Sequence, residues 1–333
     1  MKFLVTGAAG FIGSALCREL SVDGNEVIAV DCFSHYYSKN LKELRVHSLV
    51  SPHGVKMLDI NLGDKQSVID LFKKHKFDVV VHLAAQPGVR LTIKEMSKYI
   101  ESNLLGFANV LQLVIENRVP NFLYASSSSV YGRLALTPFN EKDLNLVPQS
   151  FYGSTKLANE ILTRAAVINS ETKARGLRFF SVYGPWGRPD MMYFRLMAGA
   201  LEESSINFYG DGLIKRDLTY IDDVISNIKN LAKELVGRES GYHDVVNIGN
   251  GDPISMRIVL GEIELLTSSK IKYVKMPKNV NDIETTLADR SVLESLVGVT
   301  NKTEFKEGIY KFYEWAKSTE IRKHLDTWIQ SVN

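Results

Sequence analysis

Short apolar runs alternate with longer helical segments through the first half of the chain. Six runs show this pattern: KFLVT, EVIAVD, VKMLDI, FDVVVHLAA, NFLYASS and LRFFSV. They are almost wholly apolar rather than alternating, which is typical of strands covered on both faces. Between most of them lie roughly ten or more residues with helical character, long enough for crossover helices. The pattern predicts an α/β fold with a doubly wound parallel sheet.

The second half of the chain is organised differently. Beyond the sixth run the pattern becomes irregular, with clusters of Pro and Gly between short strands and separate helices. One apolar run, DVVNIG at 244–249, is expected to rejoin the main sheet. We therefore predict a nucleotide-binding domain at 1–181, to which 217–250 returns. A smaller C-terminal α/β lobe for the substrate is expected from 182–216 and 251–333.

Composition argues against several classes of function. The 333 residues carry a net charge of only +2 and no basic run, which argues against a nucleic-acid partner. The longest apolar run is far short of a membrane span, so we expect no membrane partner. Cys17 and Cys32 lack metal or redox spacing, and the histidines are scattered along the chain. We therefore expect no metal site, and reduced thiols in a cytoplasmic protein.

Three glycines follow the first apolar run, in the segment LVTGAAGFIGSAL. Gly7 and Gly10 permit a tight turn, which lets backbone N–H groups, including those of Phe11 and Ile12, approach a pyrophosphate at the positive helix end. Gly13 permits close packing of the helix on the strand. A glycine triplet alone can be a simple strand–helix turn, but here a strand precedes it and a helix follows. This context predicts a Rossmann dinucleotide site.

Residues at the ends of the next strands indicate which dinucleotide binds. Asp31 closes the second strand, where its carboxylate can accept both ribose hydroxyls of an adenosine and would repel a 2′-phosphate. This favours NAD over NADP. Asp59 and Ile60, after the third strand, are expected to meet the adenine ring. Ala84 and Ala85, after the fourth strand, are small enough to let a ribose or a nicotinamide pass.

Tyr152 and Lys156 lie four residues apart in SFYGSTKLANE, on one face of a predicted helix. Such a pair is common by chance on amphipathic helices. This helix, however, follows the fifth strand of the sheet, and that strand ends in a serine run that includes Ser127. A phenol has a pKa of about 10 in water, so it needs nearby positive charge to act as a base near neutrality. The lysine and a nicotinamide ring would provide that charge, and the group would then abstract a proton from a carbinol.

Together these motifs resemble an extended short-chain dehydrogenase/reductase, and the chain is similar over essentially its full length to the nucleotide-sugar epimerases and dehydratases of that superfamily. The resemblance implies that Tyr152 is the base, that Lys156 anchors the nicotinamide ribose and lowers the tyrosine pKa, and that Ser127 assists at O4 of the sugar. It also implies a UDP-sugar substrate. KRDLTYIDD resembles the segment that places an arginine, here Arg216, on the UDP diphosphate. Tyr209, in INFYGDG, falls where this family packs the uridine.

The serine run indicates the type of reaction within this family. Dehydratases of the family carry Thr-Asp-Glu where this chain has Ser127, Ser128 and Ser129, and decarboxylases that make UDP-xylose carry a glutamate at the position of Ser128. The three serines are expected to contact the sugar. With no acid available for elimination, the resemblance implies oxidation at C4, rotation of the 4-keto sugar and return of hydride to its other face. That reaction is a 4-epimerisation in which NAD is recycled in place.

Three further segments are similar to the UDP-glucuronate 4-epimerases specifically: YGPWGRPDM, AAQPGVR at 84–90 and YYSKNLKELR at 36–45. In that family the arginine matching Arg188 grips the C6 carboxylate of the sugar. A planar guanidinium suits bidentate recognition of a carboxylate. Arg90, the last residue of the second segment, is also expected to contact the substrate. Arg188 could instead pair with Asp190 and only stabilise its loop.

Two alternatives to UDP-glucuronate stay open in the sequence. The same chemistry could act on UDP-glucose, UDP-N-acetylglucosamine or a pentose nucleotide, or the chain could be a catalytically silent NAD-binding scaffold. The sequence departs from the family pattern in three places. Cys32 stands where an asparagine usually follows the ribose aspartate, YGSTK replaces an alanine-rich form common in these epimerases, and Asn281 replaces a glycine before Asp282. Asp282 is expected on the substrate side. For Arg216 the alternative role is a surface pair with a neighbouring aspartate.

Assembly is implied by the resemblance alone. Relatives of this family form dimers through the helix that carries Tyr152 and the long helix before it, here about 93–117. Four side chains could line that seam or simply pack on the sheet: Leu104, Leu105, Ala108 and Leu111. We expect a homodimer.

Overall fold

The computed structural model describes residues 1–88, 95–277, 283–300 and 302–332. Its main element is a seven-stranded sheet with the strand order β10-β6-β5-β4-β1-β2-β3, and all its neighbouring strands are parallel. The strands are β1 (Lys2–Thr6), β2 (Glu26–Asp31), β3 (Lys56–Asp59), β4 (Val79–His82), β5 (Asn121–Ser127), β6 (Lys173–Phe179) and β10 (His243–Ile248). Each of the six apolar runs overlaps one of these strands, so the predicted doubly wound parallel sheet is confirmed.

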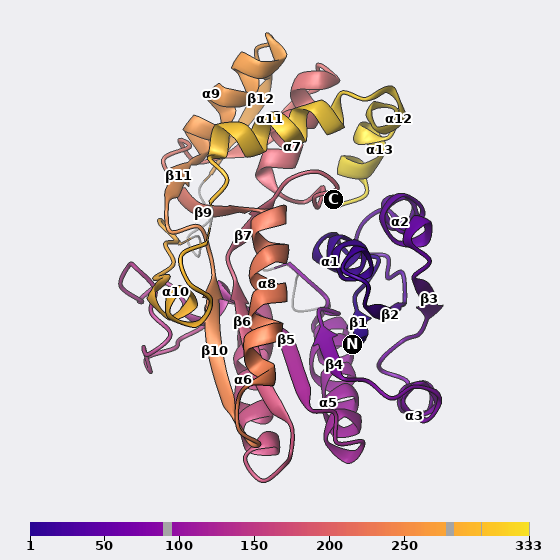
Figure 1. The fold of residues 1–333 in the computed structure, drawn as a ribbon. Helices are drawn as coiled ribbons and strands as arrows, with labels where there is room; N and C mark the ends of the chain where they lie inside the picture. Colours follow the sequence, from indigo (N-terminus) through magenta and orange to yellow (C-terminus); the bar gives the residue numbers. More distant parts are fainter. Residues whose placement is uncertain (89–94, 278–282, 301, 333) are drawn as a thin grey trace.

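Helices cover both faces of this sheet (Figure 1). Phe3 and Val5 of β1 belong to one buried cluster, which includes side chains of α1 (Phe11–Val22) and α8 (Ile221–Val236). Leu4, between them in sequence, belongs to a second cluster on the opposite face. That face is covered by α3 (Lys65–Lys74), α5 (Gly106–Glu116) and α6 (Phe151–Val167). Burial on both faces explains why the strand sequences are apolar throughout.

The strand order contains one switch point, and it lies between β1 and β4. From β1 the chain builds the sheet in one direction through β2 and β3, then returns to β4 and continues in the other direction through β5 and β6. The loops after β1 and β4 therefore leave the sheet on opposite sides. In parallel α/β sheets this divergence opens a crevice at the carboxyl ends of the strands, where ligands bind.

A second group of elements lies beyond the carboxyl ends of the strands, at the top of Figure 1. It contains α7 (Met192–Leu201), α9 (Met256–Thr267) and α11 (Phe305–Ala316). Two small sheets accompany these helices. One has the order β11 (Pro253–Ser255), β9 (Lys215–Tyr220), β7 (Ser181–Tyr183), and the other pairs β12 (Tyr273–Met276) with β8 (Ile206–Tyr209).

Shorter elements connect these groups. The short α-helices are α2 (Lys39–Arg45), α4 (Met96–Tyr99), α10 (Ser291–Val297), α12 (Thr319–Arg322) and α13 (Leu325–Gln330). The π-helical segments are η1 (Val46–Val50) and η4 (Ile100–Leu105), and the 3₁₀ turns are η2 (Ser51–His53) and η5 (Ser128–Val130).

The return of the chain to the main sheet is confirmed, because β10 pairs with β6 along its whole length. The division into 1–181 with 217–250 and 182–216 with 251–333 stays a prediction. The C-terminal helix α13 lies beside α2 of the first half (Figure 1). There the Trp328 indole N–H donates to Asn40 at 3.1 Å, and the Ser38 N–H donates to the hydroxyl of Ser331 at 2.9 Å.

His82 on β4 makes the stability of the sheet depend on pH. The side chain is 1% exposed, its Nδ1 lies 2.9 Å from the Thr6 hydroxyl, and burial lowers its pKa to about 3, with Lys156 adding to the effect. In the unfolded chain the imidazole protonates near pH 6.5, so the unfolded state binds more protons between these two values. The free energy of unfolding should therefore fall as the pH drops from about 6.5 toward 3, by up to about 1.4 kcal/mol per pH unit.

Urea unfolding at several pH values between about 7 and 5 measures this slope. His82→Gln should make the slope shallower, because glutamine does not titrate in this range. His53→Gln on the exposed η2 turn is the matched control. An unchanged slope in His82→Gln would show that other groups cause the dependence.

Candidate active site

The loop after β1 packs backbone against backbone. Gly7 has a φ of +70°, and a Cβ there would lie 2.7 Å from the backbone nitrogen of Ala84. A Cβ on Gly13 would lie 2.1 Å from the carbonyl oxygen of Gly7, and one on Gly10 would lie 2.9 Å from the same oxygen. Real Cβ atoms do not approach other atoms this closely, so each of the three positions requires glycine. The loop after β4 and the first turn of α1 both touch the glycine loop.

The amino end of α1 is open to an anion. Its N-cap is Gly10, which offers no side-chain acceptor, and its first turn contains no acidic residue. The backbone N–H groups at Phe11 and Ile12 therefore lie at the positive end of the helix without a capping carboxylate or hydroxyl. A loop that excludes Cβ atoms and leads into the positive end of a helix fits the diphosphate of a dinucleotide.

Asp31 connects the end of β2 to the glycine loop. Its Oδ2 accepts the Ala9 N–H at 3.0 Å, and its Oδ1 accepts the Phe33 N–H at 2.8 Å. Its backbone carbonyl accepts the Ile60 N–H at 3.0 Å, and Asp59 is its register partner on β3. Each carboxylate oxygen keeps a second lone pair for a ribose hydroxyl.

Other predicted cofactor contacts border the same crevice. Ala84 and Ala85, in the loop after β4, are half-buried. The Ala84 N–H donates to the hydroxyl of Thr6 at 3.2 Å, which ties the loop after β4 to the end of β1. The glycine loop, Asp31 and these alanines therefore lie around the switch point of the sheet.

Tyr152 and Lys156 lie in the first turns of α6, at the carboxyl end of β5. The Ser150 hydroxyl caps this helix by accepting the Gly153 N–H at 3.0 Å. Lys156 is 1% exposed, donates to the carbonyl of Ala125 at 2.9 Å, and has its Nζ 5.7 Å from the centre of the Tyr152 ring. The structure thus brings the predicted pair together over the fifth strand.

The charges around Tyr152 show which groups control its ionisation. Burial raises the pKa of Tyr152, and the positive charge of Arg188 and a hydrogen bond with Ser127 oppose this rise. Burial also lowers the pKa of Lys156 to about 7. The phenol therefore needs added positive charge beside it to become a base near neutral pH.

The serine run forms a tight turn next to the phenol. Ser127, at the end of β5, accepts the Ser129 N–H at 3.2 Å and donates to the Ser129 hydroxyl at 3.1 Å. Ser127 is buried, whereas Ser128 and Ser129 are half-buried in η5. All three predicted serines thus lie at the same strand end, but of the three only Ser127 affects the pKa of Tyr152, which it lowers.

Arg188 is paired with Asp190, as its alternative role predicts. Its Nε donates to Oδ1 of Asp190 at 2.9 Å and its Nη2 donates to Oδ2. Tyr36 lies against this pair: its hydroxyl donates to Asp190 at 3.3 Å, and its ring centre is 5.9 Å from the guanidinium carbon. Within the described residues, Nη1 of Arg188 donates no hydrogen bond, and the side chain is 27% exposed. One edge of the guanidinium therefore remains for a second acceptor near Tyr152.

The predicted UDP contacts lie on the small sheets. Tyr209 ends β8 and Arg216 lies on β9, and both side chains are half-buried. Nη1 of Arg216 donates to the carbonyl of Ile283 at 2.7 Å. The carboxylate of Asp217 accepts the backbone N–H groups at Asn250, Gly251 and Ala288. Arg90, Asn281 and Asp282 lie outside the described residues.

Sequence reasoning missed Asn103, which links the loop after β4 to α6. Its Oδ1 accepts the Gln86 N–H at 2.7 Å, while its Nδ2 donates to the Gln86 carbonyl at 3.1 Å and to the Thr155 hydroxyl at 3.2 Å. Asn103 lies in the π-helical segment η4, a geometry often found at functional sites. Hydrophobic periodicity carries no signal for such a turn.

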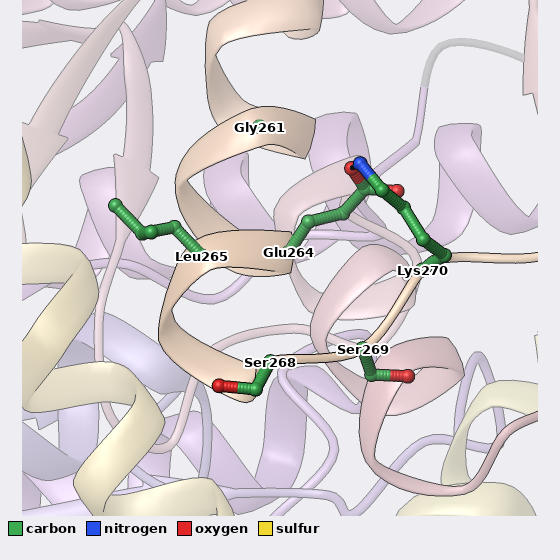
Figure 2. Close-up of a pocket in the computed structure, with 6 residues that line it drawn as sticks. All are labelled: Gly261, Glu264, Leu265, Ser268, Ser269 and Lys270. Atoms are coloured by element: carbon green, nitrogen blue, oxygen red, sulfur yellow. Dashed lines mark hydrogen bonds and ion pairs between the residues drawn. The ribbon is translucent and has the colours of Figure 1, made fainter.

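One hollow of the structure lies away from these residues. It measures about 390 Å³ and is lined by Gly261, Glu264, Leu265, Ser268, Ser269 and Lys270. Figure 2 shows it at the end of α9, with Glu264 and Lys270 converging in an ion pair of 2.6 Å. No predicted site residue lines it. It is a shallow surface feature rather than part of the crevice.

Two further searches concern metals and membranes. Within residues 1–88, 95–277, 283–300 and 302–332, His, Cys, Asp and Glu side chains form no group of three or more that could hold a metal ion. In the same part of the chain, no helix combines the length and apolar character needed to cross a membrane.

Comparison with known sequences identifies the relatives of this chain. The model of the NAD dependent epimerase/dehydratase family matches residues 3–249. The chain is 36% identical over 326 residues to UDP-glucuronate 4-epimerase 4 of Arabidopsis thaliana. The matched region covers 94% of this chain and 74% of that protein. It is also 35% identical over 328 residues to Protein CapI of Staphylococcus aureus. That match covers 95% of this chain and 98% of that protein.

Solved structures give the same grouping. UDP-glucuronic acid 4-epimerase from Bacillus cereus, in complex with UDP-glucuronic acid and NAD, matches with a TM-score of 0.87 and 31% identity, over 95% of this chain and 99% of that one. MoeE5 in complex with UDP-glucose and NAD matches with a TM-score of 0.84 and 32% identity, over 96% and 100%. With the family model matching most of its sequence, the chain belongs to the NAD dependent epimerase/dehydratase family.

Proposed function

We propose that the protein is an NAD-dependent UDP-glucuronate 4-epimerase, which interconverts UDP-glucuronate and UDP-galacturonate through a 4-keto sugar. The choice of sugar rests on the position of Arg188. The positive charge of its guanidinium lowers the pKa of the Tyr152 phenol. One edge of the guanidinium donates no hydrogen bond within the described residues. A cation beside the reacting hydroxyl suits a sugar that carries a carboxylate. The relatives named UDP-glucuronate 4-epimerase support the same substrate.

The glycine loop and the ends of the strands would hold NAD. The N–H groups at Phe11 and Ile12 suit the diphosphate, and Asp31 suits the adenosine ribose. Asp59 and Ile60 stay predicted adenine contacts, and the two alanines after β4 stay predicted neighbours of the nicotinamide side. When bound, NAD supplies a reversible hydride acceptor, so C4 of the sugar can alternate between alcohol and ketone.

Tyr152 is the proposed acid and base. Its phenolate takes the proton of the C4 hydroxyl as the ketone forms and returns a proton to that oxygen after the sugar has turned. Ser127, which lowers the pKa of the phenol, is proposed to orient the sugar oxygen. In its protonated form Lys156 adds positive charge 5.7 Å from the ring centre, from a position fixed by the carbonyl of Ala125.

The serines after β5 favour epimerisation over elimination. Ser128 and Ser129 carry no carboxylate that could protonate or deprotonate a neighbouring carbon of the sugar. The 4-keto sugar is therefore expected to rotate in the site and be reduced from its other face. The sugar must be held at its ends while its ring turns. We assign Arg188 to the C6 carboxylate and Arg216 and Tyr209 to the UDP portion.

A neutral UDP-sugar is the second candidate substrate. The pairing of Arg188 with Asp190 favours it, because the aspartate already compensates the positive charge that would attract an acid sugar. MoeE5 is known in complexes with UDP-glucose and with UDP-glucuronic acid. Arg90 and Asp282 stay predicted substrate contacts under both candidates.

We also propose a homodimer in the cytoplasm that serves polysaccharide biosynthesis. Large apolar side chains are exposed on η4 and α6: Leu105 at 49%, Ile161 at 62% and Leu162 at 46%. Of the predicted seam residues, Leu104 is half-buried and Ala108 is exposed, whereas Leu111 is buried against the sheet. A second copy covering this surface would remove the exposed leucines and isoleucine from water.

Removing the phenol oxygen tests the assignment of the base. Tyr152→Phe keeps the ring and should lower turnover of UDP-glucuronate by roughly 10²–10⁴-fold, while NAD stays bound. Turnover is followed by proton NMR, and bound nicotinamide by absorbance. Tyr124→Phe, which removes the phenol oxygen of a buried tyrosine on β5, is the matched control and should keep its turnover. Unchanged turnover in Tyr152→Phe would remove this residue from the mechanism.

Two variants separate the binding role of Arg188 from its pair with Asp190. Arg188→Ala should weaken binding of UDP-glucuronate by about tenfold or more and leave binding of UDP unchanged, because UDP has no sugar carboxylate. Asp190→Asn removes the compensating charge and should tighten UDP-glucuronate relative to UDP. Calorimetry measures both affinities. Equal losses for the two ligands in both variants would leave Arg188 with a structural role only.

A further inference from the structure

Arg45 is a buried arginine that the proposed chemistry does not use. It lies in the last turn of α2, and its side chain is fully buried. Nε donates to the carbonyl of Trp186 at 2.8 Å and Nη2 to the carbonyl of Gly187 at 2.8 Å. Nη1 donates to the hydroxyl of Tyr37 at 2.6 Å and to the carbonyl of Ala9 at 3.4 Å.

The partners of this guanidinium are all neutral. Three are backbone carbonyls and one is a phenol, and no carboxylate pairs with Arg45 among the described residues. A buried cation without a counter-charge is costly. An apolar side chain would fill the same space without that cost, so the donors of the fork must contribute something that packing alone does not.

The carbonyls that Arg45 holds belong to two loops of the site. Ala9 lies inside the glycine loop, where its N–H also bonds the predicted ribose aspartate, Asp31. Trp186 and Gly187 immediately precede Arg188 in sequence. One side chain from α2 therefore fixes the distance between the dinucleotide loop and the backbone from which Arg188 extends.

The backbone at this point is strained. Trp186 has a φ of +65°, a left-handed conformation that costs a bulky L-residue roughly 1–3 kcal/mol. The loop keeps it under two constraints. Its carbonyl accepts from Arg45, and its ring packs on Trp315 of α11 with ring centres 5.3 Å apart. Backbone strain that surrounding contacts maintain is typical of segments that orient a functional side chain.

We propose that Arg45 is a positioning residue that determines sugar specificity by holding the strained turn at Trp186 and Gly187, so that Arg188 is directed at the carboxylate of the substrate. The inference rests on the proposed carboxylate role of Arg188. Arg45 is assigned no contact with the sugar or with the reacting atoms. Its effect on binding must therefore depend on the presence of Arg188.

A double-mutant cycle tests this dependence. All proteins carry Tyr152→Phe, so that calorimetry measures binding without turnover, and the ligands are UDP-glucuronate and UDP. Arg45→Met should raise the Kd of UDP-glucuronate by about tenfold and leave the Kd of UDP within about twofold. In the Arg188→Ala background, Arg45→Met should add less than about twofold for UDP-glucuronate. If the rises in the Kd of UDP-glucuronate caused by Arg45→Met and by Arg188→Ala multiply in the double variant, the proposal is overturned.

Arg45→Lys provides a second test that does not depend on the folding of Arg45→Met. It keeps the buried positive charge, but a single ammonium cannot hold both loop carbonyls at once, so the Kd of UDP-glucuronate should again rise. Wild-type affinity in Arg45→Lys would show that the charge alone matters and would contradict a positioning role. Arg175→Met, which removes another fully buried arginine far from the loop, should lower the thermal midpoint but leave both Kd values unchanged.

The same titrations separate this inference from the proposed function. If Arg188→Ala leaves the preference for UDP-glucuronate over UDP intact, the assignment of Arg188 fails first, whatever Arg45 does. If the preference depends on Arg188 and survives in both Arg45 variants, only the positioning role of Arg45 is wrong.

Discussion

The close approach of α1 to the loop after β1 determines where everything else at the site can lie. A single Cβ on Gly13 would collide with the carbonyl of Gly7, and one on Gly7 would collide with the backbone at Ala84. Because these contacts are made by backbone alone, the positive end of α1 faces the crevice at the switch point of the sheet. The same loop supplies the Ala9 groups that Asp31 and Arg45 hold.

The helix that carries the proposed base, α6, is also held in place by hydrogen bonds. Helix α6 is capped by Ser150 at its start and is anchored farther along by Glu160, which accepts from Nε and Nη2 of Arg178 on β6 at 2.9 and 2.8 Å. Lys156 adds a hydrogen bond to the carbonyl of Ala125 on β5. The phenol of Tyr152 therefore extends from a helix bonded to two strands, as catalytic groups that need fixed geometry generally do.

The local and periodic features of this molecule could be predicted from its sequence. The apolar runs predicted the strands and the return of β10, since burial on both faces leaves a pattern in each strand by itself. The glycine triplet was recognisable because three Cβ atoms are excluded within one short loop. Tyr152 and Lys156 were recognisable because one helix fixes their spacing.

Features that join distant segments could not be predicted in this way. Arg45 lies in a helix with several charged neighbours, so its sequence context predicts a solvent-exposed side chain. In the structure it is fully buried, and it bonds the carbonyls of Trp186 and Gly187, which lie more than a hundred residues away in sequence. Asn103 depends on a π-helical turn that periodicity does not reveal. The Asp190 pair was foreseen only as an alternative, because both a substrate and a neighbouring aspartate can satisfy a guanidinium.

Arg188 is the residue proposed to give this chain an acid sugar as its substrate. Proton NMR of the protein with NAD and UDP-glucuronate, beside parallel samples with UDP-glucose and UDP-N-acetylglucosamine, tests this assignment most directly. If Arg188 selects the carboxylate, UDP-glucuronate alone is converted to its C4 epimer. Conversion of a neutral sugar while UDP-glucuronate stays unchanged would contradict it.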